Sequence, residues 1–301
     1  MTIDKKIVLG TDVFGLPLGG LLGDGDEKRE QERLLNILKT ASEKGINFCD
    51  TGVAYGDSEG VLAKAISSHD EHPWRITTKL PIFRSSVVNE EMMNQLYEAW
   101  RCTRQRFSTE QIYGVYLENV DDLEKPGAER LMNWWYTLKT EIPHLKIGVK
   151  VDSIAQLKRA FESFAFQLVQ IPLNIFDQRF HQSGMIKQLK ENGVDIHIYS
   201  SLPESEIQKP LETLPNSSTT LMPHIEQFHD QLQEKEISPI TAALMFPLSI
   251  EEVDRFVIQI ENVEQLKDLF KKWPNECIDF PFDKFSLEGE SLRLFLAHSK
   301  M

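Results

Sequence analysis

The sequence is poor in cysteine, and its cysteines lack the spacing of a metal or redox motif. Of its 301 residues only three are cysteines, Cys49, Cys102 and Cys277. An odd number without a C-x-x-C pair argues against a disulfide framework and against a cysteine-based zinc site, and it is typical of a reducing compartment. His69 and His72 lie between an expected helix and an expected strand, and we interpret them as part of a solvated turn. No metal site is predicted.

The sequence also contains little positive charge and no long apolar run. Lysine and arginine number 33 against 46 aspartates and glutamates, which gives a formal net charge of −13. A surface for nucleic acid or for an anionic membrane is therefore disfavoured. No signal-peptide pattern follows the start MTIDKKIVLG, and no stretch approaches the roughly 18 apolar residues of a membrane helix. We expect a cytoplasmic protein whose partner is a small molecule, with no nucleic-acid or membrane partner.

Amphipathic helical patterns alternate with short apolar runs almost from end to end, which is typical of βα units around a parallel sheet. Gly45 is expected to end the first helix and Ser153 to cap a later one, which begins at 154. Further helices are predicted at 90–107, 128–139, 183–192 and 263–273, with two more between 222 and 247. Strands are predicted at 7–10, 46–50, 75–79, 111–117, 145–149, 167–171, 195–199 and 255–259.

Eight strands with intervening helices in a chain of this length favour a single (β/α)8 TIM barrel, an α/β fold, over an open doubly wound sheet. No low-complexity linker divides the chain, so we expect one barrel domain over residues 1–301. The segment 203–219, with its three prolines and a Ser/Thr cluster, is interpreted as an insertion within the barrel. A C-terminal helix or lid is expected near 282–298.

Polar residues lie at the C-terminal ends of five of the expected strands. In a barrel all these ends share one face, where active sites are built, so residues distant in sequence converge there. The alternative for each of them taken singly is an ordinary solvated strand end. The five are Asp50, Lys79, Glu118, Lys150 and Tyr199.

Tyr55 follows Asp50 by five residues, and its hydroxyl is expected to face the same space. Asp50 and Lys79 are expected to form an ion pair near the barrel mouth. A lysine beside a phenol lowers the phenol's pKa from its usual value of about 10, which would suit Tyr55 to proton transfer at neutral pH. Tyr55 is therefore predicted to be a general acid. The alternative is a tyrosine that only covers the barrel rim.

Two further features are weighed and set aside. The segment 56–60, GDSEG, matches the G-x-S-x-G pattern of a hydrolase nucleophile elbow, which requires an apolar strand leading directly into it. Thr51, Gly52 and Val53 do not provide one, so Asp57 or Ser58 is better interpreted as a helix N-cap. His197 lies inside an expected strand and is interpreted as a histidine of the barrel interior.

Several segments resemble those of the aldo-keto reductases, over nearly the whole chain and in the order of that family. They are DTGVAYGDSE at 50–59, ITTKL at 76–80, LENVDDL at 117–123, KIGVKV at 146–151, QIPLNIFDQR at 170–179 and IYSSL at 198–202. The NIFDQR string is most similar to bacterial members found with surface-polysaccharide genes. The resemblance implies a (β/α)8 barrel with Asp50, Tyr55 and Lys79 in the catalytic group. It also implies a nicotinamide dinucleotide, NAD(P)H, bound without a Rossmann domain, which agrees with the lack of a G-x-G-x-x-G motif.

The resemblance further implies a set of cofactor-binding residues. Gln170 and Asn174 would hold the carboxamide, and Tyr199 would stack on the nicotinamide ring. Lys150 stands where the family usually has a serine, and it would either restore charge complementarity or block the carboxamide pocket. The remaining members of the set are Ser200, Glu261 and Asn262.

Three departures from the family pattern bear on activity. Glu118 stands in the place of the family's catalytic histidine, as in the members that reduce a steroid carbon–carbon double bond, and a neutral Glu118 could donate a hydrogen bond to a developing oxyanion. The acidic segment 203–206, PESE, lacks the glycine that lets a loop wrap the pyrophosphate. Glu261 and Glu264 oppose a 2′-phosphate at a helix N-terminus, which favours NADH over NADPH, or no cofactor.

Two hypotheses about function follow. The first is a nicotinamide-dependent oxidoreductase that reduces a carbonyl (an aldehyde, ketone or keto sugar) or a conjugated alkene, with Tyr55 as the proton donor and Glu118 polarising the acceptor. The second is a catalytically silent barrel of the same family that binds a metabolite or a protein partner. The loss of the histidine and of the loop glycine is what makes the second worth testing.

Overall fold

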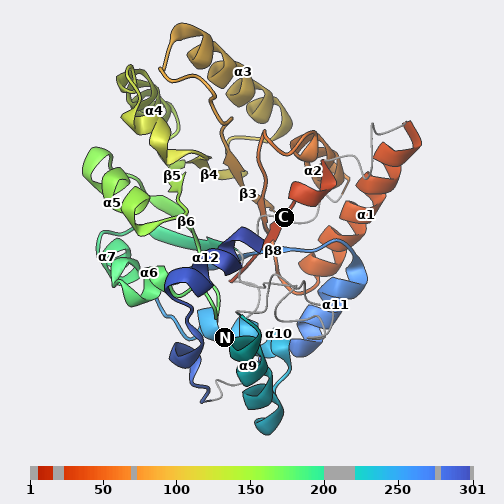
Figure 1. Ribbon diagram of the computed structural model, residues 1–301. Helices are drawn as coiled ribbons and strands as arrows, with labels where there is room; N and C mark the ends of the chain where they lie inside the picture. Colours follow the sequence, from red (N-terminus) through yellow and green to blue (C-terminus); the bar gives the residue numbers. More distant parts are fainter. Residues whose placement is uncertain (1–5, 16–23, 69–72, 200–220, 275–278, 299–301) are drawn as a thin grey trace.

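The computed structural model in Figure 1 describes residues 6–15, 24–68, 73–199, 221–274 and 279–298. Eight parallel strands follow one another around a closed barrel in sequence order, and β1 pairs with β8 to close it. This confirms the predicted (β/α)8 barrel. The strands are β1 (Ile7–Gly10), β2 (Phe48–Asp50), β3 (Arg75–Lys79), β4 (Ile112–Leu117), β5 (Lys146–Lys150), β6 (Leu168–Pro172), β7 (Asp195–Tyr199) and β8 (Arg255–Gln259).

Helices surround the barrel and connect each strand to the next, and the last two helices follow β8 (Figure 1). Short 3-10 helices follow β1 (η2, Asp12–Phe14) and β4 (η3, Val120–Glu124), and a third, η6 (Phe282–Phe285), precedes the last helix. The helices are α1 (Asp24–Ser42), α2 (Ser58–Ser67), α3 (Glu90–Arg106), α4 (Glu129–Glu141), α5 (Ile154–Ser163), α6 (Arg179–Gln182), α7 (Met185–Glu191), α9 (Met222–Glu234), α10 (Pro239–Leu248), α11 (Val263–Lys272) and α12 (Gly289–His298).

Glycine explains both an agreement and a difference with the sequence analysis. Gly45 has a φ of 77° just after α1, as predicted for a residue that ends a helix in the left-handed region. The helix predicted at 183–192 is α7, and the sequence analysis did not predict the short helix α6 that precedes it. Gly184, with a φ of 75°, separates the two helices.

Close packing between neighbouring strands also depends on glycine. A Cβ atom on Gly148 in β5 would lie 2.5 Å from the backbone oxygen of Leu168 in β6, so no larger residue fits there. The C-terminal helix α12 packs on the β6–α6 connection, since Phe295 makes an edge contact with Phe176 at 5.6 Å. No helix among the described ranges is both long enough and apolar enough to cross a membrane.

Candidate active site

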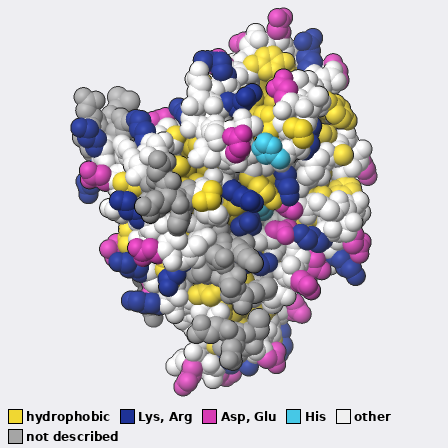
Figure 2. Space-filling view, turned by 180° about the vertical axis from the view of Figure 1, so that it is seen from behind, with side chains coloured by type: hydrophobic (Ala, Val, Ile, Leu, Met, Phe, Trp, Pro, Cys, Tyr) yellow, Lys and Arg dark blue, Asp and Glu magenta, His cyan; other side chains and the backbone are white. Residues whose placement is uncertain are grey.

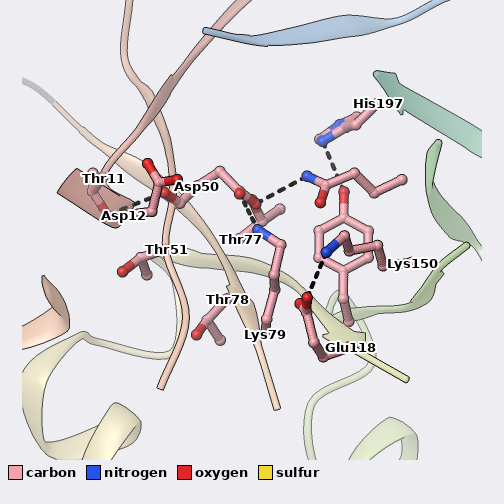
Figure 3. Close-up of polar contacts among 12 residues, drawn as sticks. Thr11, Asp12, Asp50, Thr51, Thr77, Thr78, Lys79, Glu118, Lys150 and His197 are labelled. Carbon is pink, nitrogen blue, oxygen red and sulfur yellow. Dashed lines mark hydrogen bonds and ion pairs between the residues drawn. The ribbon is translucent and has the colours of Figure 1, made fainter. Parts of the chain in front are cut away.

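The ends of β2 and β3 bring Asp50 and Lys79 together as a buried ion pair, as predicted. Figure 3 shows the two side chains pointing toward one another at the mouth of the barrel. Asp50 Oδ1 also accepts hydrogen bonds from the Thr77 hydroxyl at 2.8 Å and from Gln170 Nε2 at 3.3 Å. Side chains of β3 and β6 therefore hold this carboxylate in one orientation, and the pair can fix the position of Lys79.

Tyr55 lies next to this pair, with Lys79 Nζ 5.3 Å from the centre of its ring. Gly52 makes the approach possible, because a Cβ atom there would lie 3.1 Å from the Lys79 Cβ and 3.3 Å from the Tyr55 ring. Burial raises the pKa of Tyr55, and the carboxylates of Asp50 and Glu118 raise it further, while Lys150 opposes them. The expected lowering of this pKa by Lys79 is therefore wrong. Asp50 offsets the charge of Lys79 at the phenol, and Tyr55 stays protonated.

Glu118, which follows β4, forms an ion pair with Lys150 at the end of β5, with 2.5 Å between Oε1 and Nζ. Burial alone would lower the pKa of Lys150, but the Glu118 carboxylate outweighs burial and raises it. The two side chains point toward one another in Figure 3. This contact places an ammonium beside the carboxyl that was expected to donate a hydrogen bond, and the role of Glu118 stays a prediction. Glu118 Oε2 is buried and has no hydrogen-bond partner in the described part of the chain.

Lys150 also covers the ring of Tyr199, with Nζ 5.3 Å from the ring centre. The Tyr199 hydroxyl donates a hydrogen bond to the Asp152 carboxylate. Burial and this carboxylate raise the pKa of Tyr199. One end of the tyrosine is thus fixed, and one face of its ring is in contact with the lysine.

The two predicted carboxamide-binding residues have different surroundings. Gln170 is buried and directed toward Asp50, so it belongs to the same cluster as Lys79. Asn174 Oδ1 accepts hydrogen bonds from the backbone nitrogens of Phe176 and Asp177, both at 2.9 Å. The carboxamide oxygen of Asn174 therefore shapes its own turn.

The other predicted cofactor residues lie at the start of α11. Asn262 is its N-cap and accepts a hydrogen bond from the Gln265 backbone nitrogen at 2.9 Å, while Glu261 and Glu264 are exposed beside it. The carboxylates thus lie at a helix N-terminus, where the sequence analysis placed them. Ser200 and the PESE segment at 203–206 lie outside the described residues, as does the predicted insertion at 203–219.

The sequence analysis missed Asp12, which follows β1. Its Oδ2 accepts a hydrogen bond from Gln259 Nε2 at the end of β8, and its Oδ1 is buried without a hydrogen-bond partner among the described residues. Burial raises the pKa of Asp12 and Asp50 adds to the shift, whereas Lys79 opposes it. The signal that could have identified Asp12 is close to the one used for the other strand ends, since this carboxylate lies two residues after the end of β1.

The set-aside features have structural explanations. Ser58 is fully buried and its hydroxyl bonds to the backbone oxygen of Thr11 at 2.7 Å, so it is not an exposed nucleophile. Asp57 is the N-cap of α2, although its side chain pairs with Arg106 instead of capping the helix. His197 is buried in the barrel interior, as predicted. Within the described ranges no group of His, Cys, Asp and Glu side chains has the arrangement of a metal site, and His69 and His72 lie outside them.

The fold is a (β/α)8 barrel, and Asp50, Tyr55 and Lys79 lie together at the carboxyl end of its strands, which is the arrangement of a barrel enzyme. The model of the aldo/keto reductase family matches residues 13–279, and the chain belongs to this family. Members of the family are in general NAD(P)H-dependent oxidoreductases that act on small molecules. The similarity to members found with surface-polysaccharide genes stays a prediction.

Solved structures show the same fold at low sequence identity. The holo form of an aldo-keto reductase from Bacillus halodurans is 16% identical, with a TM-score of 0.66 over 97% of this chain and 91% of that one. A glycerol dehydrogenase from Gluconobacter oxydans is 16% identical, with a TM-score of 0.67 over the same shares. A protein of Schizosaccharomyces pombe, provisionally named a voltage-gated potassium channel subunit beta, is 41% identical over 75 residues. That match covers 24% of this chain and 22% of the relative's length.

Proposed function

We propose that the protein is an active NAD(P)H-dependent oxidoreductase that reduces a carbonyl compound, with Tyr55 as the proton donor. The observation that carries the proposal is the buried Asp50–Lys79 pair beside Tyr55 at the carboxyl end of the barrel. Conjugated alkenes stay in the proposed range of substrates, because Glu118 replaces the family's histidine. The glycerol dehydrogenase among the structural relatives adds polyols and their carbonyl products to the compounds worth testing.

The residues at the mouth fit a nicotinamide ring, with one rearrangement. Gln170 and Tyr199 come from adjacent strands on the side of the mouth that Asp50 also faces. The Lys150 ammonium lies over the Tyr199 ring, so a ring stacked on this tyrosine requires the flexible lysine side chain to turn away. Gln170 and Tyr199 would then hold the nicotinamide, with Asn262 and Glu261 near the adenosine. A bound nicotinamide dinucleotide would supply the hydride.

The chain's own residues would manage the proton and the charge. A raised pKa keeps the Tyr55 hydroxyl protonated at neutral pH, so it is available to protonate the substrate oxygen. The Lys150 ammonium favours the negative charge that Tyr55 acquires when it loses that proton, and it opposes the effect of the Asp50 and Glu118 carboxylates. We assign the polarising role to Lys150 instead of Glu118, since an ammonium stabilises a developing oxyanion and a carboxylate does not. The exposed carboxylates of Glu261 and Glu264 favour NADH.

The proposal is tested first by binding and then by turnover. NADH and NADPH are titrated separately into the purified protein, with the fluorescence of its five tryptophans as the readout. Turnover is then measured on aldehydes, keto sugars and enones. We expect binding of both cofactors, with NADH at least as tight as NADPH. A strong preference for NADPH would show that the glutamates of α11 do not face a 2′-phosphate.

Replacement of the proton donor gives the specific prediction. Tyr55→Phe should lower kcat by about 10² or more, the scale of a lost general acid, and leave cofactor affinity unchanged. Tyr136→Phe, a change at an exposed tyrosine on α4, serves as the matched control and should leave both quantities unchanged. Normal turnover of Tyr55→Phe would remove this tyrosine from the mechanism.

The silent barrel is a second candidate, because Lys150 covers the ring on which a nicotinamide is expected to stack. It predicts that neither dinucleotide binds at millimolar concentration and that no substrate class turns over. Cofactor binding together with turnover would support the oxidoreductase. The lack of both would support the silent barrel.

A further inference from the structure

The helices α3 and α4 border an open groove of about 810 Å³ on the outside of the barrel, away from the strand ends. Trp100 and Trp134 form its floor, with their rings edge to face and their ring centres 6.2 Å apart. The ring centre of Tyr97 lies 6.3 Å from that of Trp134. Tyr97 is 47% exposed although it is aromatic. Together with Met93 and two arginines, the lining is rich in the residue types that are enriched in protein–protein interfaces, namely Trp, Tyr, Met and Arg.

Four exposed charges surround this floor, Glu90 and Arg104 from α3, and Arg130 and Glu141 from α4. None of the four forms an ion pair with another described residue. Both helices run from the carboxyl end of the barrel to its amino end, so Glu90 and Arg130 lie at one end of the groove and Arg104 and Glu141 at the other. The four residues thus form the corners of a square around the groove, and negative and positive charges alternate from one corner to the next.

A square of charges that alternate in sign is electrostatically complementary to the same square on a second copy of the chain. A two-fold axis in the plane of the square, whether along the groove or across it, places each glutamate of one copy opposite an arginine of the other. Such a closed, isologous contact is the commonest form of oligomer. The groove lining has two glutamates and two arginines, so its charged groups cancel in a chain with a net charge of −13, and little net charge opposes self-association at this face. In Figure 2 the top of the molecule, the height at which α3 lies in Figure 1, shows apolar side chains among both signs of charge.

We propose that the α3/α4 groove is the interface of a homodimer, in which the aromatic floor is buried and the four charges pair between copies. This inference is independent of the proposed oxidoreductase function, because the groove lies on the helices and shares no residue with the barrel mouth. The partner it requires is a second copy of this chain.

The test uses sedimentation velocity of the full chain over a range of micromolar concentrations. The expected result is a species with the mass of two 34.7 kDa chains. An all-acidic face, made by Arg104→Glu with Arg130→Glu, should weaken association at least about tenfold, since like charges then oppose one another. An all-basic face, made by Glu90→Arg with Glu141→Arg, should do the same. An equimolar mixture of the two variants should restore the dimer as a heterodimer.

Arg101→Glu is the matched control, because Arg101 is on α3, is exposed, and pairs with Glu98 away from the groove. It should leave the dimer unchanged, and circular dichroism checks that every variant is folded. A wild-type chain that stays monomeric throughout the range would overturn the proposal. So would a dimer that survives in the all-acidic variant, or a mixture of the two variants that does not associate.

Discussion

Two lysines lie near the Tyr55 phenol, and its pKa is nevertheless raised. The reason is that each lysine has its own carboxylate, Asp50 for Lys79 and Glu118 for Lys150, so little net positive charge acts on the hydroxyl. The sequence predicted that these polar residues gather at one site, because the carboxyl ends of all strands of a barrel lie on one face. The pairing of Glu118 with Lys150 could not be predicted, because it depends on the distances that the closed barrel sets.

The Glu118–Lys150 pair gives a prediction about ionisation at the scale of single residues. Glu118 has 9% of its side chain exposed and Lys150 has 21%. If Glu118 is ionised, Lys150→Met leaves a buried carboxylate without its partner and should lower the free energy of unfolding by about 3 kcal/mol. Glu118→Met should lower it by less, since the ammonium reaches water. The double variant should be more stable than Lys150→Met alone.

Urea unfolding at neutral pH measures these differences, and the double-mutant cycle isolates the coupling between the two residues. A loss of less than about 1 kcal/mol in Lys150→Met would show that Glu118 is neutral after all. That result would return the hydrogen-bond-donor role to Glu118.

At the scale of elements, apolar periodicity and helix caps predicted most boundaries. The strands β1, β3, β7 and β8 have the predicted bounds, and Ser153 accepts the hydrogen bond from Gln156 N that a cap requires. The sequence analysis gave no role to Glu59, because a glutamate in the first turn of a helix is usually solvated. In the structure Glu59 is buried and accepts hydrogen bonds from Thr78 in β3 and from Thr103 in α3, so it joins α2 to both.

This junction gives a prediction about stability. Glu59→Ala should lower the free energy of unfolding by about 3 kcal/mol, because it leaves the buried Thr78 hydroxyl without an acceptor and removes the buried carboxylate that Thr103 and Arg106 share. Glu129→Ala, at the exposed first turn of α4, is the matched control and should change it by no more than about 0.5 kcal/mol. Denaturant unfolding of both variants measures the difference. Equal effects would mean that Glu59 does not fasten α2 to its neighbours.

At the scale of the whole molecule, the two ends of the barrel carry different polar groups. The carboxyl end carries the candidate active site, whereas Tyr113, Lys146 and Asp195 lie at the starts of their strands and bond to one another. His197 lies in the barrel interior, with its Nδ1 2.9 Å from the Tyr116 hydroxyl. In TIM barrels the amino end serves stability more than chemistry. The cluster around His197 should therefore affect unfolding and not turnover.

The pH dependence of unfolding tests this role for His197. Burial lowers its pKa to about 3, and the positive charge of Arg255 acts in the same direction. The unfolded chain has a histidine pKa near 6.5, so between these values the unfolded state binds the additional proton and the free energy of unfolding falls as pH falls. From pH 7 to pH 5 this single group should remove about 2 kcal/mol. His197→Gln keeps an acceptor for Tyr116 but has no group that titrates here. Its free energy of unfolding should therefore fall less steeply between pH 7 and pH 5, even if the variant is less stable at every pH. Urea unfolding of both proteins at several pH values in this window measures the two slopes, and parallel curves would mean that His197 titrates normally in the folded barrel.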